Sequence, residues 1–300
     1  MVIVGYWLVG YLFSNLLFVL LYLSLFFFPA TMDARLTMDK VIVFKKIIEI
    51  IDELIDHVTI VCTKTKLEIN LLTVDLAAMA SISLMGDFFT SYRINEEIIN
   101  FNVHVKEMCK ILKYAVALDD WETLQIKLEH PNSDFISFIL LKTKDTFKMR
   151  LMDIQGQNFI DGENPIDWEM FNYKIEMSPK EFTKTCDTLK GFSDVMRIHG
   201  YQNKLYFHSD SDGSAISKYS KRYKFRNYNT TFRYEISSRY SSVYMKKFSQ
   251  FFCLSEKVVI GFPLDGDNKC YTGPIMVYCS CPDNQFIICL VLGAKIDSMN

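Results

Sequence analysis

Apolar and polar positions recur with helical spacing in several short segments of the chain. The clearest is Val105–Ala115, where Met108, Ile111, Leu112 and Ala115 fall at i, i+3, i+4 and i+7. The opposite side of this predicted helix carries three lysines, which are Lys106, Lys110 and Lys113. Because the whole chain has a formal net charge of −2, this concentration of lysine is local. It suggests a surface that faces a polyanion.

Three more segments combine an apolar stripe with lysines on the other side: Phe44–Ile55, Ser178–Lys190 and Tyr244–Phe252. In the second of them, Ser178 supplies a capping residue and Pro179 takes the first helical position, a common start of a helix. The lysines on the polar sides of these three segments are Lys45, Lys46, Lys180, Lys184, Lys246 and Lys247.

The lysine-bearing segments are spaced as two similar pairs. The interval from Lys45 to Lys110 nearly equals the interval from Lys184 to Lys247, and the second pair follows the first after about 130–140 residues. A single charged helix face is common by chance, but four at a repeated interval favour an internal duplication.

The segments between the predicted helices have the pattern of strands. Residues alternate between apolar and polar in Lys66–Leu71, Thr123–Leu128 and Lys204–His208, whereas Phe135–Leu141 and Phe286–Leu292 are short apolar runs. Each half therefore predicts strands with two helices among them. This order is typical of an α+β fold with antiparallel sheets and the helices gathered on one side.

A polar, glycine-containing stretch at residues 155–168 separates the two halves and is typical of a connector. We therefore divide the chain into an apolar segment (1–31), an N-terminal domain (32–154), the connector (155–168), a C-terminal domain (169–297) and a tail (298–300).

Residues 1–31 contain no charged residue and are long enough to span a bilayer. They lack the basic start and the small-residue cleavage site of a signal peptide. Basic residues follow this segment, which predicts a cytoplasmic location for the rest of the chain if the segment is inserted. Three interpretations stand: a membrane anchor, a buried N-terminal element, or upstream translation attached to a protein that begins at Met32.

The remaining composition argues against catalysis and metal binding. The eight cysteines include no CxxC pair at zinc spacing, and several lie on predicted apolar helix faces, as reduced buried thiols do. Such usage is typical of a reducing compartment. The chain has no P-loop, nucleophile elbow, HExxH or paired-carboxylate motif. We therefore expect a protein that is not an enzyme and needs no metal or cofactor.

Several short motifs, in colinear order, resemble the sliding clamp family of proliferating cell nuclear antigen (PCNA). They are Met32–Leu36, Phe44–Ile47, Thr90–Arg93, Met108–Lys113, Arg150–Asp153 and Ala294–Asp297. Each motif alone is weak, and their order makes the resemblance specific. Because the resemblance begins at Met32, it favours the third interpretation of residues 1–31.

The resemblance implies two clamp domains per subunit, with antiparallel sheets outside and four helices lining an inner face around duplex DNA. It implies a DNA polymerase processivity factor that serves replication and repair, in the nucleus or, for a virus, at a cytoplasmic replication site. Flexible lysines attract phosphates without reading bases, which suits sliding. The implied DNA-binding residues are Lys45, Lys46, Lys106, Lys110, Lys113, Lys180, Lys184, Lys246, Lys247 and Arg35.

The resemblance also implies two protein-binding surfaces. A groove for short peptides with hydrophobic and aromatic anchors, presented by the polymerase, the clamp loader and other partners, would be lined by Val74, Met79, Phe159, Ile160, Pro274, Val291, Ala294 and Ile296. A homotrimeric ring would close by pairing an edge strand near Asp145–Arg150 with one near Ser217–Phe225. The implied interface residues are Lys148, Arg150, Tyr219, Tyr223 and Phe225.

Two alternative functions remain open at this stage. One is a membrane-anchored cytosolic domain whose lysine faces meet anionic lipid, which requires residues 1–31 to be retained. The other is a subunit of a heteromeric checkpoint-type clamp.

Overall fold

The computed structural model describes residues 30–118, 123–153, 171, 173–201, 204–211, 214–220, 224–225, 236–263, 273–281 and 283–294. Most of the apolar N-terminal segment and the whole predicted connector lie outside these residues. Within them, none of the helices combines the length and the apolar character needed to cross a bilayer.

The N-terminal half contains two helices, α2 (Met38–Asp52) and α3 (Val105–Ala117), and a 3₁₀ turn at Gly86–Phe88. Its strands are β1 (Met32–Thr37), β2 (His57–Thr63), β3 (Lys66–Leu72), β4 (Ala78–Met85), β5 (Ser91–Ile94), β6 (Ile98–His104), β7 (Thr123–Leu128), β8 (Phe135–Leu140) and β9 (Thr146–Arg150).

The C-terminal half repeats this order. Its helices are α4 (Pro179–Lys190) and α5 (Ser242–Ser249), the latter continued by a 3₁₀ helix, η2 (Gln250–Leu254). Its strands are β10 (Tyr173–Met177), β11 (Val195–Tyr201), β12 (Lys204–Ser211), β13 (Ser214–Ser220), β14 (Lys224–Phe225), β15 (Ile236–Ser241), β16 (Val258–Phe262), β17 (Ile275–Ser280) and β18 (Phe286–Leu292).

Strand pairing is the same in the two halves. The first half pairs its strands as β5-β1-β7-β8-β9 and β6-β2-β3-β4, and the second half as β14-β10-β16-β17-β18 and β15-β11-β12-β13. The two halves join where β18 pairs with β4, which makes a continuous nine-stranded antiparallel sheet. The α+β class predicted from the sequence is confirmed, and the repeated pairing is what an internal duplication produces.

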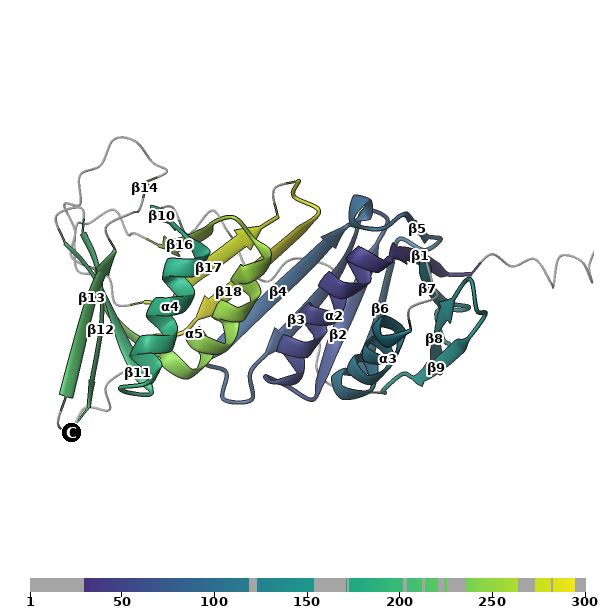
Figure 1. The fold of residues 1–300 in the computed structure, drawn as a ribbon. Coiled ribbons are helices and arrows are strands. Elements are labelled where there is room, and N and C mark those ends of the chain that lie inside the picture. Colours follow the sequence, from purple (N-terminus) through teal and green to yellow (C-terminus); the bar gives the residue numbers. More distant parts are fainter. Residues whose placement is uncertain are drawn as a thin grey trace, which may run out of the picture.

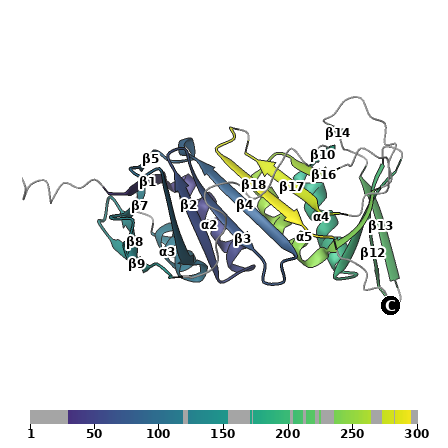
Figure 2. The same ribbon diagram turned by 180° about the vertical axis from the view of Figure 1, so that it is seen from behind.

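All four helices lie on one side of the nine-stranded sheet (Figure 1), and the view from behind shows its strands uncovered by helices (Figure 2). Helix α2 packs beside α3, and α4 beside α5. Their apolar sides are buried with the inward residues of the strands in one large core that spans both halves. The opposite sides of the helices therefore face outward together.

Two predicted helices differ in extent from the observed ones. Helix α2 begins at Met38 and ends at Asp52, so Leu54 and Ile55 lie beyond it, where the chain turns toward β2. In the last segment, Tyr244 is half-buried and Met245 takes the buried place instead. Tyr244 is turned outward because its hydroxyl group binds Asp75 in the other half.

Candidate nucleic-acid interface and docking groove

The outward sides of the four helices form the lysine face, which we define by the lysines at positions 45, 46, 106, 110, 113, 180, 184, 246 and 247. Helix α3 contributes the most exposed group, with 61% of the Lys110 side chain and 55% of the Lys113 side chain accessible. The helical period produces this separation, because Met108 and Leu112 on the other side are buried.

Carboxylates are interleaved with these lysines. Glu49 of α2 lies between the two helices of the first half: its Oε1 is 2.9 Å from Lys45 Nζ and 3.7 Å from Lys113 Nζ. Lys110 Nζ is 2.7 Å from Glu107 Oε1, one turn away on the same helix. This hydrogen bond lowers the pKa of Glu107. Three lysines of the first half are therefore paired with acids.

The second half has the same mixture. Lys246 of α5 is 3.7 Å from Asp187 Oδ1 of α4. Lys180 and Lys184 of α4, like Lys106 of α3, are exposed, and no ion pair of theirs is found among the described residues. The lysine face is thus positive but partly neutralised, as expected from acids standing at Asp52 and Asp187.

Two predicted DNA-binding residues are used differently. Lys247 Nζ donates a hydrogen bond of 2.5 Å to the backbone carbonyl of Glu53, just past the end of α2. A cation there also favours the negative end of the helix dipole. Arg35 lies on strand β1, where it alternates with buried Ala34 and Leu36, and its Nε is 3.4 Å from Asp33 Oδ1. It is therefore separated from the helix lysines.

Contacts between the halves at this junction were missed by the sequence analysis. Gln250 Nε2 donates to Glu53 Oε2 at 3.1 Å, and Tyr244 Oη donates to Asp75 Oδ1 at 2.9 Å. The partners are separated by more than half of the chain, so periodicity contains no signal for them.

The docking groove, defined by the residues predicted for peptide binding, is partly described. Met79 and Val291 face each other across the β4–β18 pairing, and both pack on a small apolar cluster of Phe171, Met276 and Cys289. Val74 projects from the β3–β4 turn with 95% of its surface exposed. Pro274 and Ala294 are half-buried. Phe159, Ile160 and Ile296 lie outside the described residues.

The groove cluster also contains residues that the sequence analysis did not single out. Phe171, Met276, Tyr278 and Cys289 belong to it, and alternation along β17 and β18 was the available signal. Gly261 leaves room for this cluster, because a Cβ atom there would lie 2.6 Å from Met276 Cε and 3.0 Å from Phe171 Cβ.

The predicted interface segments lie at sheet ends, with one correction. Strand β9 is the last strand of its sheet, and its Lys148 and Arg150 are exposed. The segment Ser217–Phe225 is not one edge strand: β13 ends a four-stranded sheet, whereas Phe225 in β14 pairs with Ile175 in the large sheet. A two-residue strand in another sheet cannot extend the β13 edge. Tyr223 and the side chains of Tyr219 and Phe225 lie outside the description.

The described cysteines are thiols shielded mostly by burial. Burial raises the pKa of Cys62 to about 12 and raises the pKa of Cys186 and Cys289 as well. Such thiols are poor nucleophiles at neutral pH. Among the described residues, no group of three or more His, Cys, Asp or Glu side chains could hold a metal ion.

Comparisons with known proteins agree with this geometry. Residues 32–158 match the family model described as "Proliferating cell nuclear antigen, N-terminal domain". The chain is 26% identical over 263 residues to the "Proliferating cell nuclear antigen" of Caenorhabditis elegans, which covers 84% of this chain and 93% of that protein. The chain is a divergent PCNA-like sliding clamp.

Other members of this clamp group match over shorter stretches. The "DNA polymerase sliding clamp" of Nitrosopumilus maritimus (strain SCM1) is 23% identical over 172 residues, covering 57% of this chain and 64% of that protein. In structure, the clamp fold matches the crystal structure of PCNA from Entamoeba histolytica with a TM-score of 0.70 and 16% identity, over 89% of this chain and 100% of that chain.

Proposed function

We propose that the chain forms a ring that encircles duplex DNA and acts as a processivity factor for a DNA polymerase in replication and repair. The observation that carries this proposal is the lysine face, because four helices from both halves present their exposed lysines on one side of a single sheet. Lysine ammonium groups are mobile point charges, so they attract the phosphate backbone without fixing a register.

Ring closure is supported by the internal repeat. Within the chain, β4 pairs with β18, and the strands that hold their places in the other halves, β13 and β9, are left at sheet ends. A second copy that pairs its β13 with this β9 would repeat the internal junction. Such a head-to-tail contact generates a ring when the rotation closes, and we propose a homotrimer.

The repeat also fixes the register of this contact. The equivalent strand pairings place Ile216 where Ala80 stands and Phe147 where Leu290 stands, and Ala80 faces Leu290 across the internal junction. Ile216 would therefore face Phe147 of the next subunit. The same alignment places Lys218 opposite Asp145, so opposite charges meet at this edge.

Partner docking is proposed for the docking groove. Apolar Met79 and Val291 are only partly buried, and Val74 stands exposed beside them. These residues suit a short peptide with hydrophobic and aromatic anchors, supplied by a polymerase, a clamp loader or other replication proteins. The chain would act where DNA is replicated, in the nucleus or at a viral site in the cytoplasm, and would need no catalytic residue or cofactor.

The test is retention on DNA after loading. Full-length protein loaded on closed circular DNA should remain bound and should slide off when the circle is cut. The double variant Lys110→Glu, Lys113→Glu should lose about tenfold or more in retention, with a shallower salt dependence. The matched control is Lys64→Glu, Lys127→Glu, on the β2–β3 turn and on β7. Equal retention on linear and circular DNA, or equal effects of the two double variants, would refute encirclement. Native mass of the loaded species separates a homotrimer from a heteromeric ring.

A further inference from the structure

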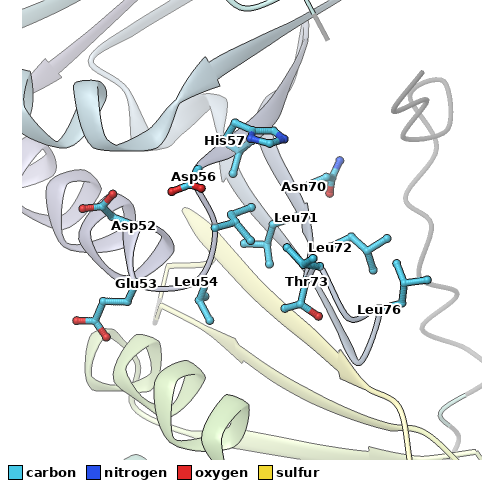
Figure 3. A pocket seen from close by; sticks show the side chains of 13 residues that line it. Asp52, Glu53, Leu54, Asp56, His57, Asn70, Leu71, Leu72, Thr73 and Leu76 are labelled. Carbon is cyan, nitrogen blue, oxygen red and sulfur yellow. The ribbon is translucent and has the colours of Figure 1, made fainter. Parts of the chain in front are cut away.

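A pocket of 640 Å³ lies beside the docking groove, at the end of α2 (Figure 3). It is lined by the last residue of α2 and the loop that follows (52–56), the start of β2, the end of β3 and the β3–β4 turn. None of its lining residues was singled out by the sequence analysis except Val74. Because Val74 also belongs to the docking groove, the two surfaces are continuous.

Negative charge collects on one wall of this pocket. Asp52, Glu53 and Asp56 line it, and His57 is the one lining residue with a basic side chain. The last turn of α2 contains no basic residue, so the negative end of that helix dipole is compensated only by Lys247, which binds the Glu53 carbonyl. A cation entering this pocket would meet three carboxylates and the carbonyl end of a helix.

A buried amide oxygen on the opposite wall lacks a donor. Asn70 is 6% exposed, it lines the pocket from β3, and its Oδ1 has no hydrogen-bond partner. The hydroxyl groups of its two cross-strand neighbours are engaged elsewhere, because Thr59 donates to Asn102 and Ser81 donates to Glu68. A buried acceptor without a donor is costly, so Asn70 is a place prepared for an incoming N–H group.

The rest of the lining is apolar. Leu54, Leu71 and Leu72 contribute side chains, and Leu76 stands at the rim with 71% of its surface exposed. Walls of this kind cover the methylene stem of a long side chain while its charged end reaches polar groups.

We infer that this pocket takes a basic side chain, Arg or Lys, from the peptide that occupies the docking groove. The inference rests on the proposed docking function and adds a preference for a positively charged flank beside the anchors. Among the described residues no group could hold a metal ion, and the carboxylates repel DNA phosphate. A peptide cation is therefore the occupant that the charges favour.

The test uses full-length protein and three fluorescent synthetic peptides. The peptides share one aliphatic and two aromatic anchors and differ only in a flanking pair, which is Arg-Arg, Gln-Gln or Glu-Glu. Fluorescence anisotropy should give about tenfold tighter binding for the Arg-Arg peptide than for the Gln-Gln peptide. The variant Asp52→Asn, Asp56→Asn should reduce this preference to about twofold, whereas Glu96→Gln, Glu97→Gln, on the β5–β6 turn, should leave it unchanged. Asp56→Lys should shift the preference toward the Glu-Glu peptide.

The outcomes separate this inference from the function on which it rests. If all three peptides bind equally and Asp52→Asn, Asp56→Asn changes nothing, peptide docking stands and the basic-side-chain pocket is refuted. If no peptide binds wild-type protein, docking is refuted and the pocket with it. Asn70→Leu, which keeps the volume but removes the amide oxygen, should weaken the Arg-Arg peptide and leave the Gln-Gln peptide unchanged. An equal loss for both peptides would refute the role of Asn70.

Discussion

Tyr244 Oη donates a hydrogen bond of 2.9 Å to Asp75 Oδ1 and thereby ties helix α5 of the second half to the β3–β4 turn of the first. Asp75 is held in place locally, since the Thr73 hydroxyl and the Ala77 amide also donate to Oδ1. The contact lies between the lysine face and the docking groove. It therefore couples the turn that carries Val74 to the helices that face DNA.

Removing this bond should make the chain less stable and less sensitive to acid. Burial alone would raise the pKa of Asp75, but hydrogen bonds from Thr73, Ala77 and Tyr244 outweigh it and lower the pKa. A carboxylate with a lowered native pKa stabilises the fold above its unfolded pKa, about 4, and this stabilisation is lost as pH falls through the native value. Asp75→Asn should therefore lower unfolding free energy at pH 7 and flatten the loss of stability below about pH 5.

Tyr244→Phe tests the same bond from the other side. It should cost about 0.5–1 kcal/mol at pH 7, because the bond is partly exposed and screened by solvent. The control is Tyr114→Phe, whose ring packs edge-on against Phe147 and which should change stability little. Urea unfolding at pH 7 and pH 4 measures both. Equal effects of the two Tyr→Phe changes would show that the Asp75 bond contributes nothing.

The helices were predictable because each buries one stripe and exposes another with a strict period. In α3 the buried residues Met108 and Leu112 and the exposed Lys110 and Lys113 follow the helical repeat. Strand β7 was likewise found with its observed bounds, Thr123–Leu128, because its inward residues alternate with outward ones. Local periodicity reports burial, and burial fixes these elements.

Contacts between the halves could not be predicted in the same way. Lys247 has the spacing of a lysine on an exposed helix side, yet its ammonium group caps the chain end of α2 at Glu53. The segment around Tyr219 and Phe225 has the composition of one continuous strand, yet the chain divides it between two sheets. Both outcomes depend on where another part of the chain lies, which a local pattern does not contain.

Gly261 should be intolerant of any side chain. A Cβ atom there would lie 2.6 Å from Met276 Cε and 3.0 Å from Phe171 Cβ, and the second is too near the backbone to move freely. Gly261→Ala should cost about 1–3 kcal/mol through overpacking. It should also weaken peptide binding, since this cluster supports Met79 and Val291.

The matched control for Gly261 is Gly293→Ala in the same half. Its Cβ would make only an ordinary contact of 3.5 Å with the Ala77 carbonyl, so thermal unfolding should stay near that of wild type. A Gly261→Ala protein as stable as the Gly293→Ala protein would contradict the packing argument.

Glu49 should act as a brake on DNA binding. Its carboxylate is paired with Lys45 on α2 and with Lys113 on α3, so both ammonium groups are partly neutralised. Glu49→Gln should free them, increase retention on circular DNA, and steepen the salt dependence by about one unit of logarithmic slope per lysine freed for a phosphate contact. Glu96→Gln, an exposed acid on the β5–β6 turn, is the control. A Glu49→Gln protein with unchanged salt dependence would place these lysines away from DNA.

The register proposed for ring closure can be tested by cross-linking. If β13 pairs with β9 of the next subunit as β4 pairs with β18, Phe147 and Ile216 of neighbouring subunits lie directly opposite, with Cβ atoms about 4.5–5.5 Å apart. The variant Phe147→Cys, Ile216→Cys should then form covalent rings under mild oxidation, seen as a trimer band on a non-reducing gel. Phe147→Cys, Ser220→Cys, which places the second thiol near the end of β13, should remain monomeric on the same gel. Cross-linking of the second pair but not the first would show that the subunits meet in a different register, and cross-linking of neither would show that these two edges do not pair.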